Sequence, residues 1–441
     1  MSEPPVPQNT KSNGPIKPRI IIHGGAGNIT KTSIPRDRYN EYHTSLLRIV
    51  SQASFVLSYP GISALDVATY AVTLLENDPL YNSGHGAVFT RAGHNELEAS
   101  IMVSDGYRKR GVGVMMLQHV KNPIRLAREL LMRGEEDGGD GSQDHCQYSG
   151  KYAEWLAAKW GLEIVDEEYF FTQRKWDEHK RGLAEEKRKE EQGLRVDEVS
   201  EWEKDTYVPL GTCGAVVIDS FGTICVATST GGLTNKVPGR IGDTPTLGAG
   251  FWAEEWFEAA KREMLYQPSP AVNSPLDKLS RGELRSLMGD CLPSSSSQEP
   301  SRSPAESESN TEKPSDEIRH AVGLSSSGNG DSFLRMCAAR TTAANSRFSR
   351  TSLSRATTWM TGPGGELQRS AGERWGTVHE GTGGMIGLEV VGNRVDVVCD
   401  YNCGGMFRAW TEEDGSKQCL IFRKDSWDSG PENWNSVHKD V

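Results

Sequence analysis

Two threonines frame a predicted hairpin in the middle of the chain. Residues 215–218 and 223–228 are short, β-branched apolar runs that flank a four-residue turn signal at 219–222, a pattern typical of two paired, buried strands. A turn centred there places Thr212 and Thr230 nearly opposite each other, with their Cβ atoms roughly 5 Å apart. Two hydroxyl groups at one strand end suit a nucleophile and its partner. The alternative is that both positions are threonine only because threonine favours β-strands.

Cleavage before Thr212 would change its chemistry. A Thr hydroxyl is a poor nucleophile, but a Thr at a chain N-terminus carries its own base, an α-amine with a pKa of roughly 7.7–8. A charged segment leads into Gly211-Thr212, and the apolar run follows at once. Cleavage of the Gly211–Thr212 bond would create that base. The alternative is that Gly211-Thr212 is only the start of a strand, which would have the same local pattern.

A Gly/Pro-rich loop at 234–245 carries Arg240 and Asp243, three residues apart. Arginine can bind a carboxylate through two hydrogen bonds, and aspartate can accept an ammonium group. The pair can therefore hold both charges of an amino-acid backbone. The alternative is an internal surface salt bridge, which is the commoner fate of such pairs.

Several sequence blocks occur in a characteristic order. They comprise residues 23–27 (HGGAG), 75–86 (LENDPLYNSGHG), 98–102 (EASIM), 122–124 (NPI), 211–216 (GTCGAV) and 227–232 (ATSTGG). Together they resemble the plant-type L-asparaginases, or isoaspartyl peptidases, which are N-terminal nucleophile hydrolases. The resemblance covers residues 19–260 and resumes at 321–340, which makes it far more specific than any single glycine loop.

The resemblance implies an α+β fold, a four-layer αββα sandwich, that is made as an inactive precursor. The precursor would cleave itself before Thr212 into an α-chain (1–211, with the hydrolase half from residue 18) and a β-chain (212–441). The family also implies a dimer of αβ units. Residues 172–204, rich in Lys, Arg and Glu, are then a charged helix or linker within the α-chain.

The resemblance also implies roles for individual residues. Thr212 would attack the side-chain amide carbonyl of the substrate, with its freed α-amine as base. Thr230 would orient and polarise the nucleophile, and Asn82 would hold its surroundings by hydrogen bonds. Arg240 would bind the substrate α-carboxylate and Asp243 its α-ammonium, in agreement with the charge argument above.

Residues 327–330 (SGNG) match the family's Thr-Thr-Gly-x-Gly loop. The Ser327 hydroxyl and the Gly328 N–H are therefore oxyanion-hole candidates, and Gly328 and Gly330 would border the substrate. Serine in place of the usual Thr keeps the hydroxyl but loosens its rotamer. Cys213, where Val is more usual, is most simply a small core residue.

One further segment resembles a loop that wraps a structural sodium ion in the family. The ion would be bound through backbone carbonyls and would take no part in catalysis; no other cofactor is implied. The residues concerned are Leu75, Glu76, Asp78, Tyr81 and Ser83.

The surrounding sequence predicts the elements that must position these groups. Apolar residues recur at helical spacing between 36 and 120 and again between 124 and 160, with a strand at 111–117. Residues 19–23 predict a strand that enters a glycine loop, and residues 318–340 predict a Ser/Gly loop and a helix. The chain ends in strands at 384–391 and 394–400.

Composition restricts the class of protein. The 441 residues carry a net charge of −11, which disfavours nucleic acid or an anionic membrane as partner and favours a small-molecule substrate. No apolar run is long enough to span a bilayer, residues 1–17 lack a secretory signal, and eight cysteines without CxxC pairs indicate a reducing compartment. We therefore expect a cytoplasmic protein, with a disordered tail at 1–17 and a disordered insertion at 293–317.

The sequence thus predicts a threonine hydrolase that acts on L-asparagine or β-aspartyl dipeptides through a covalent β-aspartyl enzyme. One alternative is a threonine aspartase-like endopeptidase, because the 293–317 insertion and the tract before Gly211 look more like those larger proteins. Asp243 favours the small substrate, since it suits a free α-ammonium. The other alternative is a non-catalytic scaffold that docks partners through the insertion.

Overall fold

The computed structural model describes residues 16–105, 111–195, 197–207, 211–259 and 317–438. The expected tail at 1–17 lies outside these ranges except for its last two residues, of which Ile16 is buried. The expected insertion at 293–317 also lies outside them, apart from Glu317, the first residue of a strand.

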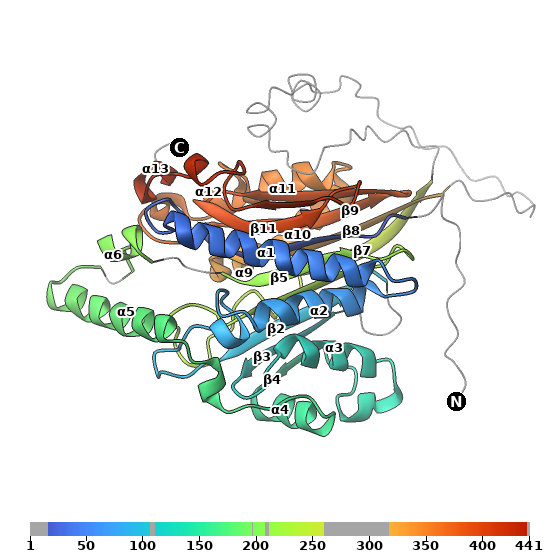
Figure 1. Cartoon of the computed structure of the whole chain (residues 1–441), viewed down its shortest axis with the longest axis horizontal. Helices are drawn as coiled ribbons and strands as arrows, with labels where there is room; N and C mark the ends of the chain where they lie inside the picture. Colours follow the sequence, from blue (N-terminus) through green and yellow to red (C-terminus); the bar gives the residue numbers. More distant parts are fainter. Residues whose placement is uncertain (1–15, 106–110, 196, 208–210, 260–316, 439–441) are drawn as a thin grey trace, which may run out of the picture.

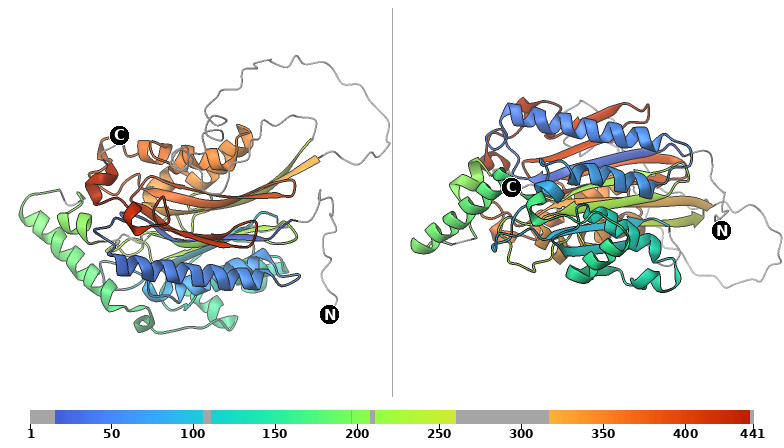
Figure 2. Two further views of the ribbon diagram at one scale, coloured as in Figure 1. Left: turned by 45° about the horizontal axis from the view of Figure 1, so that its top comes forward. Right: turned by 60° about the horizontal axis from the view of Figure 1, so that its bottom comes forward.

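Two β-sheets face each other between two layers of helix (Figures 1 and 2). The larger sheet holds β1 (Arg19–Gly27), β2 (Leu97–Val103), β3 (Gly111–Leu117), β4 (Gln147–Ser149), β5 (Cys213–Ile218), β6 (Ile224–Thr230), β11 (Gly405–Thr411) and β12 (Lys417–Leu420). Its order is β12-β11-β1-β5-β6-β2-β3-β4. The smaller sheet holds β7 (Phe251–Ala259), β8 (Glu317–Gly328), β9 (Gly383–Val391) and β10 (Arg394–Tyr401), in the order β10-β9-β8-β7.

Helices cover the outer faces of both sheets. On the larger sheet lie α1 (Arg36–Leu57), α2 (Ala64–Glu76) and α3 (Pro123–Arg133), and α4 (Gly150–Lys159) packs beside β3. On the smaller sheet lie α10 (Ala338–Phe348) and α11 (Leu353–Thr361), next to the shorter α9 (Gly330–Met336) and α12 (Glu366–Arg369). The last described element is α13 (Trp434–His438). This order of layers confirms the predicted αββα sandwich.

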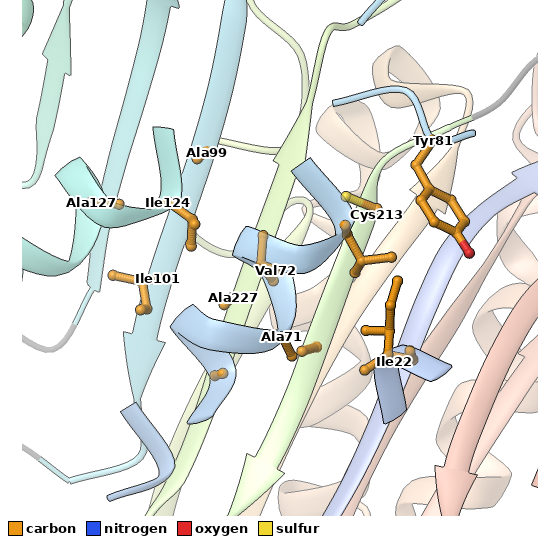
Figure 3. Packing of buried hydrophobic residues seen from close by; sticks show 14 of the residues in the cluster. Ile22, Ala71, Val72, Tyr81, Ala99, Ile101, Ile124, Ala127, Cys213 and Ala227 are labelled. Atoms are coloured by element: carbon orange, nitrogen blue, oxygen red, sulfur yellow. The ribbon is translucent and has the colours of Figure 1, made fainter. Parts of the chain in front are cut away.

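The helix layer forms where the sequence periodicity predicts it. Ser63 caps α2 by accepting a hydrogen bond from the Asp66 N–H, as serine commonly does at a helix start. The apolar face of α2 then packs on the larger sheet, where Ala71 and Val72 lie over the strands that carry Cys213 and Ala227 (Figure 3). Within the described residues, no helix is both long enough and apolar enough to cross a membrane.

The predicted hairpin is present as β5 and β6. The ladder pairs Cys213 with Ser229 and ends there, so Thr212 and Thr230 form the next pair beyond it. Cys213 faces the helix layer and is fully buried there, which agrees with its predicted role as a core residue. Because side chains alternate along a strand, Thr212 and Thr230 both face the space between the sheets.

Two predicted loops are strands instead. The glycine-rich run is the second half of β1, with a register shift between His23 and Gly25. A Cβ on Gly24 would lie 2.3 Å from the Tyr81 ring, so close packing, and not a turn, requires glycine there. The Ser/Gly run is the end of β8, where buried hydroxyls find partners on β1: Ser325 Oγ lies 2.6 Å from His23 Nε2.

The charged tract at 172–204 contains α5 (Gln173–Glu191) and all but the last residue of the short α6 (Glu201–Asp205). Helix α5 is not wholly solvated, because Lys175, His179 and Lys189 are buried. His179 Nδ1 lies 2.5 Å from Asn235 Oδ1, which ties this helix to the loop that carries Arg240.

Candidate active site

The predicted site residues converge on one cleft of about 450 Å³. It opens at the ends of β5, β6 and β8, between the two sheets. The cleft is lined by Gly211, Thr212, Thr230, Arg240, Asp243, Gly328 and Gly330. Ser327 and Asn82 are fully buried and are not among the residues that line it.

Thr212 has an unexpected hydrogen-bond partner. Its Oγ1 lies 2.6 Å from the Thr244 Oγ1, and the Thr212 side chain is almost fully buried. Thr230 Oγ1 instead accepts the Gly232 N–H at 3.0 Å. In the unbroken chain, therefore, Thr244 and not Thr230 forms the hydrogen bond to the hydroxyl of Thr212, the predicted nucleophile. Sequence reasoning assigned Thr244 no role, and its only signal was its position directly after Asp243.

The residue before Thr212 is packed against the predicted oxyanion loop. A Cβ on Gly211 would lie 2.2 Å from Ser327 Oγ and 3.1 Å from the Gly328 nitrogen, so only glycine fits. The Ser327 hydroxyl is fixed here because it accepts the Ala26 N–H at 2.9 Å. The two groups predicted to stabilise an oxyanion thus lie beside the peptide unit that precedes Thr212.

Asp243 is buried and Arg240 is partly buried, and each has hydrogen-bonding atoms without a partner among the described residues. Arg240 Nε and Asp243 Oδ2 have no hydrogen-bond partner among the described residues, while Arg240 Nη2 lies 3.2 Å from Asp331 Oδ2. Burial raises the pKa of Asp243 to about 7, against the opposing effect of Arg240. Buried polar atoms normally have hydrogen-bond partners. The carboxylate and ammonium groups of a zwitterionic ligand would supply the missing partners of Arg240 and Asp243.

Gly330 leaves the space that such a ligand needs. A Cβ at this position would lie 2.5 Å from Asp243 Oδ1 and 3.0 Å from Arg240 Nη2. The absence of a side chain therefore keeps both charged groups accessible from the cleft.

Two glutamates, one in β2 and one just before it, hold the loop that carries these two residues. Glu98 accepts the Gly242 N–H at 3.1 Å, and Glu96 accepts the Gly239 N–H at 2.9 Å. The buried Lys236 ammonium lies 3.7 Å from Glu98 and donates to the Glu96 carbonyl. Burial raises the pKa of Glu98, against Lys236 and Gly242. Sequence reasoning quoted Glu98 within a motif but gave it no role.

Asn82 positions the turn after Thr230 and does not touch the cleft. Its Nδ2 donates to the Gly232 carbonyl at 2.7 Å, and its Oδ1 accepts the Val88 N–H at 3.1 Å. Its backbone carbonyl also accepts the Gly231 N–H. Asn82 thus acts on the strand end that faces Thr212, which is where the resemblance placed it.

The predicted sodium loop connects α2 to the turn Gly84–Gly86. Its side chains are engaged elsewhere: Asp78 accepts from Ser45 and Arg48, and Ser83 Oγ lies 3.0 Å from Cys213 Sγ. Backbone carbonyls remain, and those of Glu76, Pro79 and Tyr81 lie so close to the glycine turn that a Cβ there would clash with them. Carbonyl oxygens suit a hard cation, so the loop fits a cation held by its backbone.

Comparisons with known proteins agree with this geometry. A model of the asparaginase family matches residues 16–261. A putative isoaspartyl peptidase/L-asparaginase of Dictyostelium discoideum is 38% identical over 262 residues, 54% of this chain and 70% of the relative. An isoaspartyl peptidase of Escherichia coli is 40% identical over 234 residues, 53% of this chain and 67% of the relative.

A third relative aligns with nearly the whole chain. It is a probable isoaspartyl peptidase/L-asparaginase 2 of Arabidopsis thaliana, 29% identical over 417 residues, which cover 91% of this chain and 98% of the relative. The αββα sandwich, with Thr212 at the start of a central strand, is that of an N-terminal nucleophile hydrolase. The chain belongs to the asparaginase family.

Proposed function

We propose that the protein hydrolyses the side-chain amide of L-asparagine and the isopeptide bond of β-aspartyl dipeptides, after cleaving itself between Gly211 and Thr212. The observation that carries this proposal is the shared cleft, in which Thr212 lies with the incompletely bonded Arg240 and Asp243. A nucleophile beside a zwitterion site selects an amino acid whose side chain reaches the nucleophile.

In the first step, Thr212 Oγ attacks the carbonyl carbon of Gly211, and the Gly211–Thr212 amide becomes an ester. Water then hydrolyses this ester, which leaves a carboxylate on Gly211 and a free α-amine on Thr212. The contacts of Gly211 with Ser327 Oγ and Gly328 N support a role for these groups in stabilising the oxyanion of this step.

In the catalytic cycle, the α-amine of Thr212 takes the proton of its own hydroxyl while Oγ attacks the amide carbon of the substrate. The leaving nitrogen departs with that proton, as ammonia or as the amino group of the second residue. Water then attacks the β-aspartyl ester and releases aspartate. Arg240 and Asp243 hold the substrate backbone by charge-assisted hydrogen bonds throughout.

Purified, processed protein tests this proposal directly. We expect release of aspartate from L-asparagine and from β-aspartyl-alanine, and no release by the Thr212→Ala variant. A threonine aspartase-like endopeptidase would instead cleave a folded protein substrate, and a scaffold would release nothing. The free zwitterion pocket at Arg240 and Asp243 favours the small substrates over both alternatives.

We further propose that the loop at 75–83 holds a structural sodium ion, and that the protein is a cytoplasmic dimer of αβ units without nucleic-acid or membrane partners. The carbonyl arrangement near Gly84 supports the ion site. Buried thiols such as Cys213 and Cys403, whose pKa burial raises to about 12, suit a reducing compartment. Light scattering of the processed protein tests the dimer.

A further inference from the structure

The oxyanion loop separates two charged regions of the cleft. On its Gly330 side lie Arg240 and Asp243. On its Gly328 side lies the segment that leads into β9: the Asn329 N–H donates to the Thr382 carbonyl at 2.9 Å, and a Cβ on Gly328 would lie 2.4 Å from that oxygen. Consider a substrate whose side-chain amide is held at Gly328 and whose α-carbon lies at Arg240. The leaving group of that amide then points toward this segment.

Two arginines, Arg335 and Arg374, lie on this side of the cleft, and the carboxylate of Glu380 binds both. Glu380 is mostly buried, and its Oε1 lies 2.5 Å from Arg335 Nη2 while its Oε2 binds Arg374 Nε. Burial would raise the pKa of Glu380, but hydrogen bonds from Arg374 and Arg335 outweigh it and lower that pKa. Both arginine side chains are nearly half exposed, 48% and 45%, and both line the cleft.

A carboxylate of the chain itself already binds one of these two arginines, Arg374. Asp197 Oδ2 lies 3.0 Å from Arg374 Nη1, and Asp197 belongs to the segment that precedes Gly211. The other acidic groups nearby are Glu203, which also lines the cleft, and Asp331, which pairs with Arg240. Arg374 therefore binds a second carboxylate in addition to Glu380, while Arg335, which also lines the cleft, lies on the other oxygen of Glu380.

We propose that Arg335 and Arg374, held by Glu380, form a subsite for the α-carboxylate of the leaving residue of a β-aspartyl dipeptide. The substrate carboxylate would take the place that Asp197 fills in the unbroken chain. This inference rests on the proposed function. L-Asparagine, whose leaving group is ammonia, has nothing that reaches the subsite, so these arginines discriminate between the two substrates.

The test compares three substrates: L-asparagine, β-aspartyl-alanine, and β-aspartyl-alanine amide, which lacks the second carboxylate. We expect processed wild-type protein to prefer the free dipeptide over its amide by about 10- to 100-fold in kcat/KM, the range for a charge-assisted pair. Arg374→Gln and Arg335→Gln should remove most of that preference and leave kcat/KM for L-asparagine within about twofold.

Two controls keep the result interpretable. Arg369→Gln alters an exposed arginine of α12 that pairs with Glu366 and should change nothing. Arg374→Lys keeps the positive charge but lacks the planar guanidinium group that can form two parallel hydrogen bonds. This variant should therefore retain part of the preference for the free dipeptide.

Equal losses for all three substrates, or an unchanged preference for the free carboxylate in Arg374→Gln, would overturn the subsite. Failure of wild-type protein to hydrolyse any of the three would instead overturn the proposed function.

Discussion

The hydroxyl groups of Thr212 and Thr244 lie 2.6 Å apart in the wall of the cleft. Thr244 is itself held firmly, because its backbone carbonyl accepts the Ser100 hydroxyl at 2.6 Å, and Ser100 Oγ also bonds to the Thr228 hydroxyl. Hydroxyl groups from β2 and β6 thus fix the loop residue that bonds to the proposed nucleophile, Thr212. Thr244 is a positioning residue for Thr212.

Removal of the Thr244 hydroxyl should slow the chemistry without weakening substrate binding. Since a single orienting hydrogen bond is worth about 0.5–1.5 kcal/mol, we expect Thr244→Ala to lower kcat for L-asparagine by about 3- to 10-fold, with KM within about twofold. Thr244→Ser should restore most of the rate. Steady-state kinetics on processed protein measure both, and an equal loss in the Ser and Ala variants would show that the methyl group matters instead.

Titration of Asp243 should make kcat/KM depend on pH. Its pKa of about 7 means that the carboxylate is lost as pH falls below 7, and with it the partner of the substrate ammonium. The Thr212 α-amine, with a pKa of roughly 7.7–8, is also protonated there. Because kcat/KM reports the free enzyme, log kcat/KM should fall on the acid side with a slope that approaches 2, while log kcat approaches a slope of 1.

The control for this profile is Asp243→Asn. It should weaken binding at every pH and reduce the acid-side slope of log kcat/KM to about 1, since only one titrating group remains. Identical slopes in wild type and variant would assign the pH dependence to groups other than Asp243.

A methyl group at Gly330 should obstruct the zwitterion pocket. Its Cβ would lie 2.5 Å from Asp243 Oδ1 and 3.0 Å from Arg240 Nη2, and overpacking of this kind costs about 1–3 kcal/mol. We expect Gly330→Ala to raise KM for L-asparagine by about 10- to 100-fold, with a smaller change in kcat. Because this clash is present without substrate as well, Tm should also fall; an unaltered KM would place the substrate elsewhere.

Asn82 should contribute mainly to stability. Asn82→Ala leaves the Gly232 carbonyl and the Val88 N–H without the partners they have now, and each buried group left unpaired costs about 1–3 kcal/mol. Urea unfolding should therefore report a loss of about 2–4 kcal/mol. Gln418→Ala, at an exposed position of β12, should stay within about 0.5 kcal/mol. A neutral Asn82→Ala would contradict the positioning role.

The elements that depend on local pattern were predictable from the sequence. The β5–β6 hairpin follows from two apolar runs and a turn, and its register brings Thr212 next to Thr230 because that register is set by the turn between them. The helical periodicity before residue 120 likewise gives α1 and α2. Arg240 and Asp243 could be proposed as a pair because they lie three residues apart.

Contacts between distant segments were not predictable in this way. Thr244 lies next to Thr212 because the loop after β6 folds back, where Glu96 and the β2 residue Glu98 accept hydrogen bonds from its backbone. The serines of β8 have the composition of a turn, yet they lie in a strand, where His23 pairs with the Ser325 hydroxyl and the Ala26 N–H with the Ser327 hydroxyl across the two sheets. Such partnerships exist only once the two sheets are stacked.

The central claim is that Thr212 becomes an N-terminal nucleophile, and the intact mass of the denatured protein tests it most directly. Wild-type protein should give two fragments that meet between Gly211 and Thr212, whereas Thr212→Ala should give one unbroken chain. A single unbroken chain from wild-type protein after prolonged incubation, or a cut at another bond, would contradict the account.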